Sequence, residues 1–269
     1  MDKLLVLGTG AARAMHYYNT CFLLQSASGN MLVDGGGGNG ILRQLTNAGI
    51  SLNSLKNIFV THEHIDHSLG ILWLIRMNAS LFLAGKRRET LTIRCHEELA
   101  EKIRLICSLT LSAKQLSALD SGISISPVHD GEALSIAGHT VTFFDTHSAK
   151  AKQYGFHMES GSGQRLVCTG DEPCHPSCEQ YVDGADWLLH EAFCLEKDSP
   201  LFHPHDIGHG TVKEAALLAQ KNNVRNLVLW HTEDSATLGR RKELYTEEAR
   251  QYFHGNIFIP NDLENISLS

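Results

Sequence analysis

One short segment constrains this chain more than any other, because it holds four metal-ligand side chains within six positions: His62, His64, Asp66 and His67. It directly follows an apolar run at residues 58–61, which predicts a buried strand, and active-site loops commonly follow strands. Imidazole and carboxylate suit Zn²⁺, and also Mn²⁺ or Fe²⁺, whereas the lack of cysteine in the segment argues against a closed structural zinc site. The alternative is a solvated histidine-rich loop. We expect a fold that presents this segment at a strand end.

The size and composition are those of a globular protein with a substantial core. The 269 residues are 42% hydrophobic, and we expect a single domain spanning residues 1–269. The net charge of −7 gives no general basic field, so nucleic acid would have to bind a local patch such as Lys86, Arg87 and Arg88. We find no apolar stretch that could span a bilayer, no basic leader in residues 1–10 and seven scattered cysteines, which together predict a cytoplasmic protein with reduced thiols.

Hydrophobic periodicity predicts strands and helices in both halves of the chain. In the first half we expect strands at residues 3–7, 21–25, 31–33, 58–61 and 91–94, and helices from Asn39 to Gly49, at 69–77 and at 97–108. In the second half we expect strands at 123–128, 141–146, 166–169, 187–190 and 227–230, with helices near 212–222 and 242–253. This pattern favours an α/β protein in which two sheets pack face to face with helices outside.

Three later strand ends also carry potential ligands: His147, Asp171 and His231. A lone histidine after a strand is more often structural, but the three occur in the order that completes a known pattern. Together with His-x-His-x-Asp-His they resemble the metallo-β-lactamase superfamily over nearly the whole chain. The resemblance implies an αββα sandwich of two mixed β-sheets with helices on the outer faces. It also implies two divalent metal ions, most simply Zn²⁺: one held by His62, His64 and His147, the other by Asp66, His67 and His231, with Asp171 bridging them.

The C-terminal half resembles the ribonuclease Z branch, at residues 189–193, 208–211 and 224–231. By this resemblance Glu191 and His209 would relay a proton toward the leaving oxygen, a role suited to a histidine oriented by a carboxylate. The alternative is that Glu191 caps a surface element and His209 merely begins the next helix.

Two departures argue against tRNA as the substrate. The short bacterial ribonuclease Z has a long tRNA-binding arm between the third metal histidine and the bridging aspartate, whereas here only residues 148–170 lie there, enough for a strand, a turn and a strand. Residues 12–20 also lack that family's N-terminal motif. We therefore expect a phosphodiesterase for small-molecule esters, in which a metal-bridging hydroxide attacks phosphorus and Asp66 orients it. A tRNA 3′-endonuclease or a lactone, lactam or thioester hydrolase is the alternative, and a homodimer is left open.

A non-hydrolytic scaffold or electron-transfer role is disfavoured, because all seven ligands are present and the chain has no room for a flavin module. Cys168, Cys174 and Cys178 have irregular spacing and Pro173 and Pro176 nearby, so free thiols are expected rather than another metal site. His203 and His205 fit either substrate positioning or a solvated loop. Asp34 is expected to hydrogen-bond the histidine segment, and the glycines at 35–38 to permit tight packing.

Overall fold

Two seven-stranded sheets form the centre of the computed structural model, which describes residues 2–268. The first sheet contains, in spatial order, β14 (Asn265–Ser267), β1 (Lys3–Gly8), β2 (Cys21–Ser26), β3 (Gly29–Val33), β4 (Asn57–Phe59), β5 (Leu91–Cys95) and β6 (Ile123–Pro127). The second contains β13 (Asn256–Phe258), β12 (Asn226–Trp230), β11 (Trp187–Glu191), β10 (Arg165–Cys168), β9 (Tyr154–Glu159), β8 (His139–Asp145) and β7 (Ala133–Ile136).

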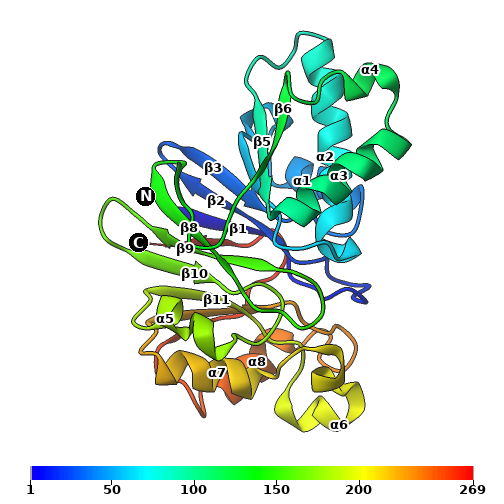
Figure 1. The fold of residues 1–269 in the computed structure, drawn as a ribbon. Coiled ribbons are helices and arrows are strands. Elements are labelled where there is room, and N and C mark those ends of the chain that lie inside the picture. Colours follow the sequence, from blue (N-terminus) through cyan, green and yellow to red (C-terminus); the bar gives the residue numbers. More distant parts are fainter. Residues whose placement is uncertain (1, 269) are drawn as a thin grey trace.

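Helices cover the outer face of each sheet, so four layers follow one another from top to bottom in Figure 1. Those over the first sheet are α1 (Gly40–Asn47), α2 (Ile65–Leu83), α3 (Glu97–Thr110) and α4 (Ala113–Leu116). Those over the second are α5 (Glu179–Val182), α7 (Val212–Lys221) and α8 (Arg241–Ala249), while α6 (Ser199–Phe202) projects to one side. The predicted αββα sandwich is confirmed. None of the helices in residues 2–268 has the length and apolar character that a bilayer crossing requires.

Aromatic side chains fill the space between the sheets. The rings of Phe22 and Trp230, from different sheets, stack with centroids 4.6 Å apart, and those of Phe59 and Phe143 lie 4.8 Å apart. Separate apolar clusters lie beneath the helices on each side. Because these contacts join the two sheets directly, they hold the strand ends of one sheet in place against those of the other.

The directions of six strands bring the polar strand ends to one edge of the sandwich. β3 and β4 are parallel, as are β10, β11 and β12. β8 is antiparallel to β9, which is antiparallel to β10, so β8 and β10 run the same way. The residues at or just beyond these carboxyl ends are Asp34, His62, His147, Asp171, Glu191 and His231.

The helix predicted at 69–77 begins earlier than expected, at Ile65. Asp66 and His67 therefore lie in its first turn rather than in a loop, and a carboxylate there suits the positive end of the helix dipole. The short strands β7, β13 and β14 were not predicted. Between His147 and Asp171 the chain forms β9, a turn and β10, as the spacing of these two residues predicted.

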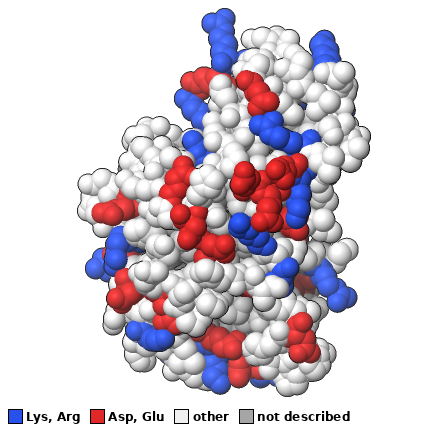
Figure 2. All heavy atoms as spheres, in the orientation of Figure 1, with Lys and Arg blue, Asp and Glu red and all other residues white. Residues whose placement is uncertain are grey.

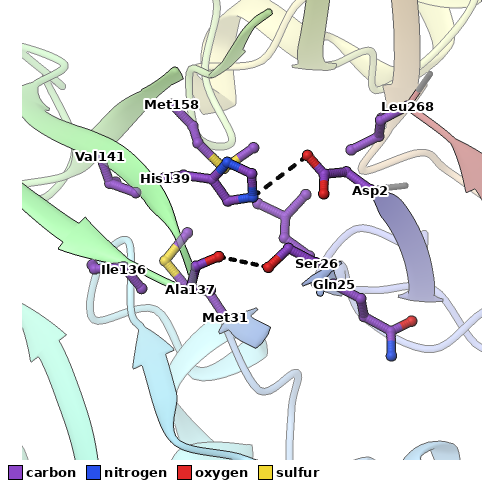
Figure 3. Close-up of a pocket in the computed structure, with 11 residues that line it drawn as sticks. Asp2, Gln25, Ser26, Met31, Ile136, Ala137, His139, Val141, Met158 and Leu268 are labelled. Atoms are coloured by element: carbon purple, nitrogen blue, oxygen red, sulfur yellow. Dashed lines mark hydrogen bonds and ion pairs between the residues drawn. The ribbon is translucent and has the colours of Figure 1, made fainter. Parts of the chain in front are cut away.

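A small cavity at the start of β8 lies away from these strand ends (Figure 3). It measures about 10 Å³, and the side chains of His139 and Asp2 face each other across it, with Nε2 and Oδ2 3.5 Å apart. Nearby, the Ser26 hydroxyl donates to the carbonyl of Ala137 (2.5 Å). This volume holds one water molecule at most, so the cavity is too small for a substrate.

Candidate metal centre

A buried carboxylate at the end of β3, Asp34, organises the segment that follows β4. Its Oδ1 atom accepts a hydrogen bond from the backbone N–H of Thr61 (2.8 Å). Its Oδ2 atom accepts two more, from the Thr61 hydroxyl (2.8 Å) and from Nδ1 of His67 (2.7 Å). Asp34 has a left-handed backbone (φ 59°), which aspartate tolerates better than most residues. One carboxylate thus links the ends of β3 and β4 to the first turn of α2, as expected.

These hydrogen bonds determine which ring nitrogens face the other predicted ligands. A carboxylate only accepts, so Nδ1 of His67 is the donor. The Thr61 hydroxyl gives its proton to Asp34, and its oxygen therefore accepts from Nδ1 of His62, 2.9 Å away. Nε2 of each ring is then the nitrogen that faces the other predicted ligands and can bind a metal when it carries no proton.

The electrostatics at His67 also favour a cation. Burial opposes a positive charge on this ring, but the carboxylates of Asp34 and Asp66 outweigh burial and raise the pKa of His67 well above its ordinary value. Nε2 of His67 is therefore a strong binding position for a proton or, in its place, a metal ion.

Six of the seven predicted ligands come together in two adjoining groups: His62, His64 and Asp171, and then Asp66, His67 and His231. Within each group the ligand atoms lie within 4.8 Å of one another. Oδ2 of Asp171 is 3.5 Å from Nε2 of His62 and 3.7 Å from Nε2 of both His67 and His231. Asp171 therefore contacts both groups, the position that a bridging ligand requires.

The surroundings of Asp171 fit a divalent cation. Its Oδ1 atom is buried and has no hydrogen-bond partner among residues 2–268. Burial would raise the pKa of this carboxyl, but the imidazoles of His62, His231 and His67 hold it well below its usual range. The backbone N–H of Asp171 donates to Oε1 of Gln153 (3.0 Å). An ionised, positioned carboxylate among imidazole nitrogens is a donor set suited to zinc-like ions.

His147 is the predicted ligand whose side chain does not join these groups. It follows β8 with a left-handed backbone (φ 56°), its side chain is exposed, and its ring centroid lies 5.2 Å from that of His175. To act as a ligand, the ring would have to turn from His175 toward His62. Its role as a ligand stays a prediction.

Glu191 and His209 form a buried pair beside the metal-ligand groups. Glu191 is fully buried; its Oε1 atom accepts from the backbone N–H of Gly210 (2.6 Å), and its Oε2 atom lies 3.7 Å from Nδ1 of His209. Neither Oε2 of Glu191 nor Nδ1 of His209 has a hydrogen-bond partner within the described chain. Burial, and then the charge of Asp171, raises the pKa of Glu191 well above its usual range, while burial lowers that of His209 to about 3. Both shifts favour the neutral form of each group.

His209 also has contacts on its other side. It forms a third potential ligand group with Asp171 and His231, and its ring centroid lies 5.0 Å from that of His231. Phe193 stacks on it at 5.3 Å. Phe193 also lines a cavity of about 490 Å³ together with Met15, Phe202, Leu238 and others. Phe193 thus connects His209 to a cavity of the size that holds a small molecule, although none of the predicted metal ligands lines that cavity.

The cysteines form no metal site in the part of the chain that the structure describes, and all are free thiols. His203 and His205 are exposed on the loop before His209, and His205 pairs with Glu214 (2.9 Å).

Sequence reasoning missed Gln153, which holds the backbone of Asp171. It also missed Lys150, whose ammonium lies 4.0 Å from Asp171. Neither residue belongs to a motif that the sequence could have revealed.

The fold and this donor set define the chain as a metal-dependent hydrolase of the metallo-β-lactamase superfamily. The family model described as Anti-Pycsar protein Apyc1 matches residues 2–236, and the chain belongs to that family. A ribonuclease Z of Bradyrhizobium sp. (strain ORS 278) is 28% identical, over 86% of this chain and 89% of that protein.

Solved structures share the fold at lower sequence identity. The metallo-β-lactamase fold protein YhfI of Bacillus subtilis superposes with a TM-score of 0.80 at 22% identity, covering 98% of both chains. A diphosphatase of the PhnP family superposes with a TM-score of 0.72 at 16% identity, covering 98% of this chain and 96% of that one. These likenesses confirm the architecture.

The central position of Asp171 predicts how metal content changes when it is removed. Protein purified without chelator should hold close to two transition-metal ions per chain, and Asp171→Ala should lose affinity for both, because its carboxylate contacts both ligand groups. Elemental analysis after dialysis measures this. Asp183→Ala removes an exposed carboxylate and should leave the metal content unchanged. Full retention of both ions by Asp171→Ala would contradict the bridging assignment.

The hydrogen bonds of Asp34 predict a second effect that acts through ring orientation. Asp34→Asn keeps the shape and tolerates the left-handed backbone, but an amide cannot accept all three hydrogen bonds. Metal affinity, measured by chelator competition, should fall about 10- to 100-fold. Asp262→Asn alters a half-buried carboxylate that accepts from the Thr9 hydroxyl and the Tyr18 backbone instead, and should leave the affinity unchanged. Equal affinity in Asp34→Asn and the unmodified chain would refute the argument.

Proposed function

We propose that this chain hydrolyses small phosphodiesters. The observation that carries the proposal is the buried Glu191–His209 pair beside the central carboxylate of Asp171, because it combines a potential proton donor with a divalent-cation site. Cleavage of a diester needs both a stabilised phosphate and a protonated leaving oxygen. Hydrolysis of a thioester has less need of a proton donor, because a thiolate departs more readily than an alkoxide.

The residues that would hold the metals are the two ligand groups that meet at Asp171. His62 and His64 would bind one ion, completed by His147, and Asp66, His67 and His231 would bind the other. When bound, such ions supply positive charge for the phosphate and lower the pKa of a water nucleophile. Zinc is the favoured ion because most of the donors are imidazoles. Asp66 would orient the water or accept its proton.

The proton for the leaving oxygen would come from Glu191 through the ring of His209. The Nε2–H bond of neutral His209 breaks as its proton passes to the departing oxygen, and Nδ1 takes the carboxyl proton of Glu191. The ring ends neutral with its proton on Nδ1, and Glu191 ends as a carboxylate. A proton taken up at Nε2 of the ring then lets Nδ1 return its proton to Glu191, which restores both groups. Both groups are buried, with only 11% of the His209 side chain exposed, so competing water is excluded.

Three features support a small substrate. The cavity beside His209 has the volume of a small-molecule site, about 490 Å³. The stretch between β9 and β10 is a short turn rather than an arm. On the face drawn in Figure 2, acidic and basic side chains are interspersed, without a continuous basic band for a polyanion.

RNA is the second candidate substrate, and the relative named ribonuclease Z favours it because 86% of this chain aligns with that protein. A substrate panel distinguishes the two. Metal-loaded protein should hydrolyse bis(p-nitrophenyl) phosphate and cleave precursor tRNA poorly at physiological salt, because the net charge of −7 disfavours the binding of a polyanion. Lactone and thioester substrates belong in the same panel. Efficient tRNA cleavage with negligible action on the diester would favour the ribonuclease function instead.

The role of His209 predicts a leaving-group effect. His209→Ala should keep both metals and lower kcat by about 10²- to 10⁴-fold on an alkyl diester, the usual contribution of general acid catalysis. The loss should shrink on a nitrophenyl diester, because nitrophenolate departs without a proton. His254→Ala removes an exposed histidine elsewhere and should match the unmodified chain.

Two results would reassign His209. An equal loss on both diesters would indicate that the ring positions the substrate or supports the structure. Loss of metal would indicate a ligand, in line with its proximity to Asp171 and His231.

A further inference from the structure

One lysine at the rim of the metal-ligand groups, Lys150, takes no part in the proposed metal binding or proton transfer. Lys150 lies in the loop between β8 and β9, and its ammonium is 4.0 Å from Oδ2 of Asp171 and 3.6 Å from Oε1 of Glu172. The residue as a whole is exposed, but only 23% of its side chain is, which is low for a lysine. Its positive charge thus lies beside the central carboxylate.

The ammonium of Lys150 has three donors and uses none of them within residues 2–268. Both carboxylate distances exceed that of a hydrogen bond. The Ser148 hydroxyl is the group that bonds to Oε1 of Glu172, at 2.5 Å. A partly buried cation with unsatisfied donors is suited to an arriving anion, which can accept several of these hydrogen bonds at once.

The path of the Lys150 side chain is fixed by a glycine on another loop. Gly208 has a left-handed backbone (φ 70°), and a Cβ atom there would lie 2.8 Å from Cδ and 3.0 Å from Cε of Lys150. The methylene chain therefore packs against the backbone immediately before His209. This packing directs the ammonium toward the ligand groups rather than into solvent.

The positive charge of Lys150 affects the pKa of two histidines among the metal-ligand groups, His64 and His209. Burial is the main cause that lowers the pKa of His64 and of His209, and the Lys150 ammonium adds to it in each case. A negative charge placed among these residues would interact with the ammonium and with the predicted metals together.

We infer that Lys150 binds a non-bridging oxygen of the substrate's phosphate and so selects anionic esters over neutral ones. The inference rests on the proposed phosphodiesterase function. It assigns to Lys150, which packs against the backbone just before His209, the local positive charge that a net-negative chain needs in order to bind an anion. A lactone or thioester carries no such charge and would gain nothing from this lysine.

The test compares two lysines of the same loop in metal-loaded protein. Lys150→Gln and Lys152→Gln remove the same charge, but Lys152 points to Glu98 and to the ring of Tyr154. Calorimetry with inorganic phosphate gives Kd, and bis(p-nitrophenyl) phosphate gives KM and kcat. We expect Lys150→Gln to raise Kd and KM about 10- to 100-fold, the effect of one hydrogen bond to a charged group, with unchanged metal content. Lys150→Arg should restore most of the affinity.

Each outcome of this test either supports or overturns the inference about Lys150. A selective loss in Lys150→Gln with recovery in Lys150→Arg supports the inference. Phosphate affinity unchanged in Lys150→Gln, or equally reduced in Lys152→Gln, overturns it while leaving the phosphodiesterase proposal intact. If the unmodified chain binds phosphate but does not hydrolyse the diester, the proposed function fails, and the Kd comparison still decides the role of Lys150.

Discussion

The centre depends first on the carboxylate of Asp34, which does not contact the predicted metals. By accepting from Thr61 and His67 it orients two rings and joins two strands to a helix. This is feasible only because α2 lies directly against the loop after β3. A Cβ atom on Gly70 would collide with the carbonyl of Gly35, and the backbone N–H groups of Gly35 and Gly70 donate across the contact between loop and helix. Gly35, Gly36 and Gly37 therefore serve close packing, as the sequence suggested, whereas a Cβ atom on Gly38 would meet nothing within 4 Å.

The second requirement is the meeting of two sheets. Asp34, His62 and His67 come from the first sheet and its helix, whereas Asp171 and His231 follow strands of the second. Their Nε2 and Oδ2 atoms approach within 3.5 to 3.7 Å only because aromatic packing fixes one sheet on the other. The loop between β1 and β2 lies next to this contact of the two sheets. There, Oδ2 of Asp234 accepts from the backbone N–H groups of Met15 and His16. The cavity beside His209 is bounded by that loop.

Sequence reasoning succeeded where the information is local or repeated in known order. The ligands near His62 lie within six consecutive positions. Asp171 and His231 could be placed because each follows a strongly apolar strand. The strands β7, β13 and β14 have only three or four residues, too few for a periodic pattern. Lys150 could not be found, because its position depends on Gly208, far along the chain. His147 was placed at its strand end, but its left-handed backbone turns the ring toward His175, which no pattern encodes.

Two buried carboxylates show how environment divides the tasks of one functional group. Asp34 accepts three hydrogen bonds and can only orient its partners, because every lone pair that faces a neighbour is occupied by a donor. Glu191 accepts one, from Gly210, and burial together with the charge of Asp171 favours its protonated form. Its second oxygen lies 3.7 Å from Nδ1 of His209, the atom to which the proposed mechanism passes its proton. The difference in the number of donors, rather than in chemistry, makes Asp34 an orienting group and suits Glu191 to the proposed role of proton source.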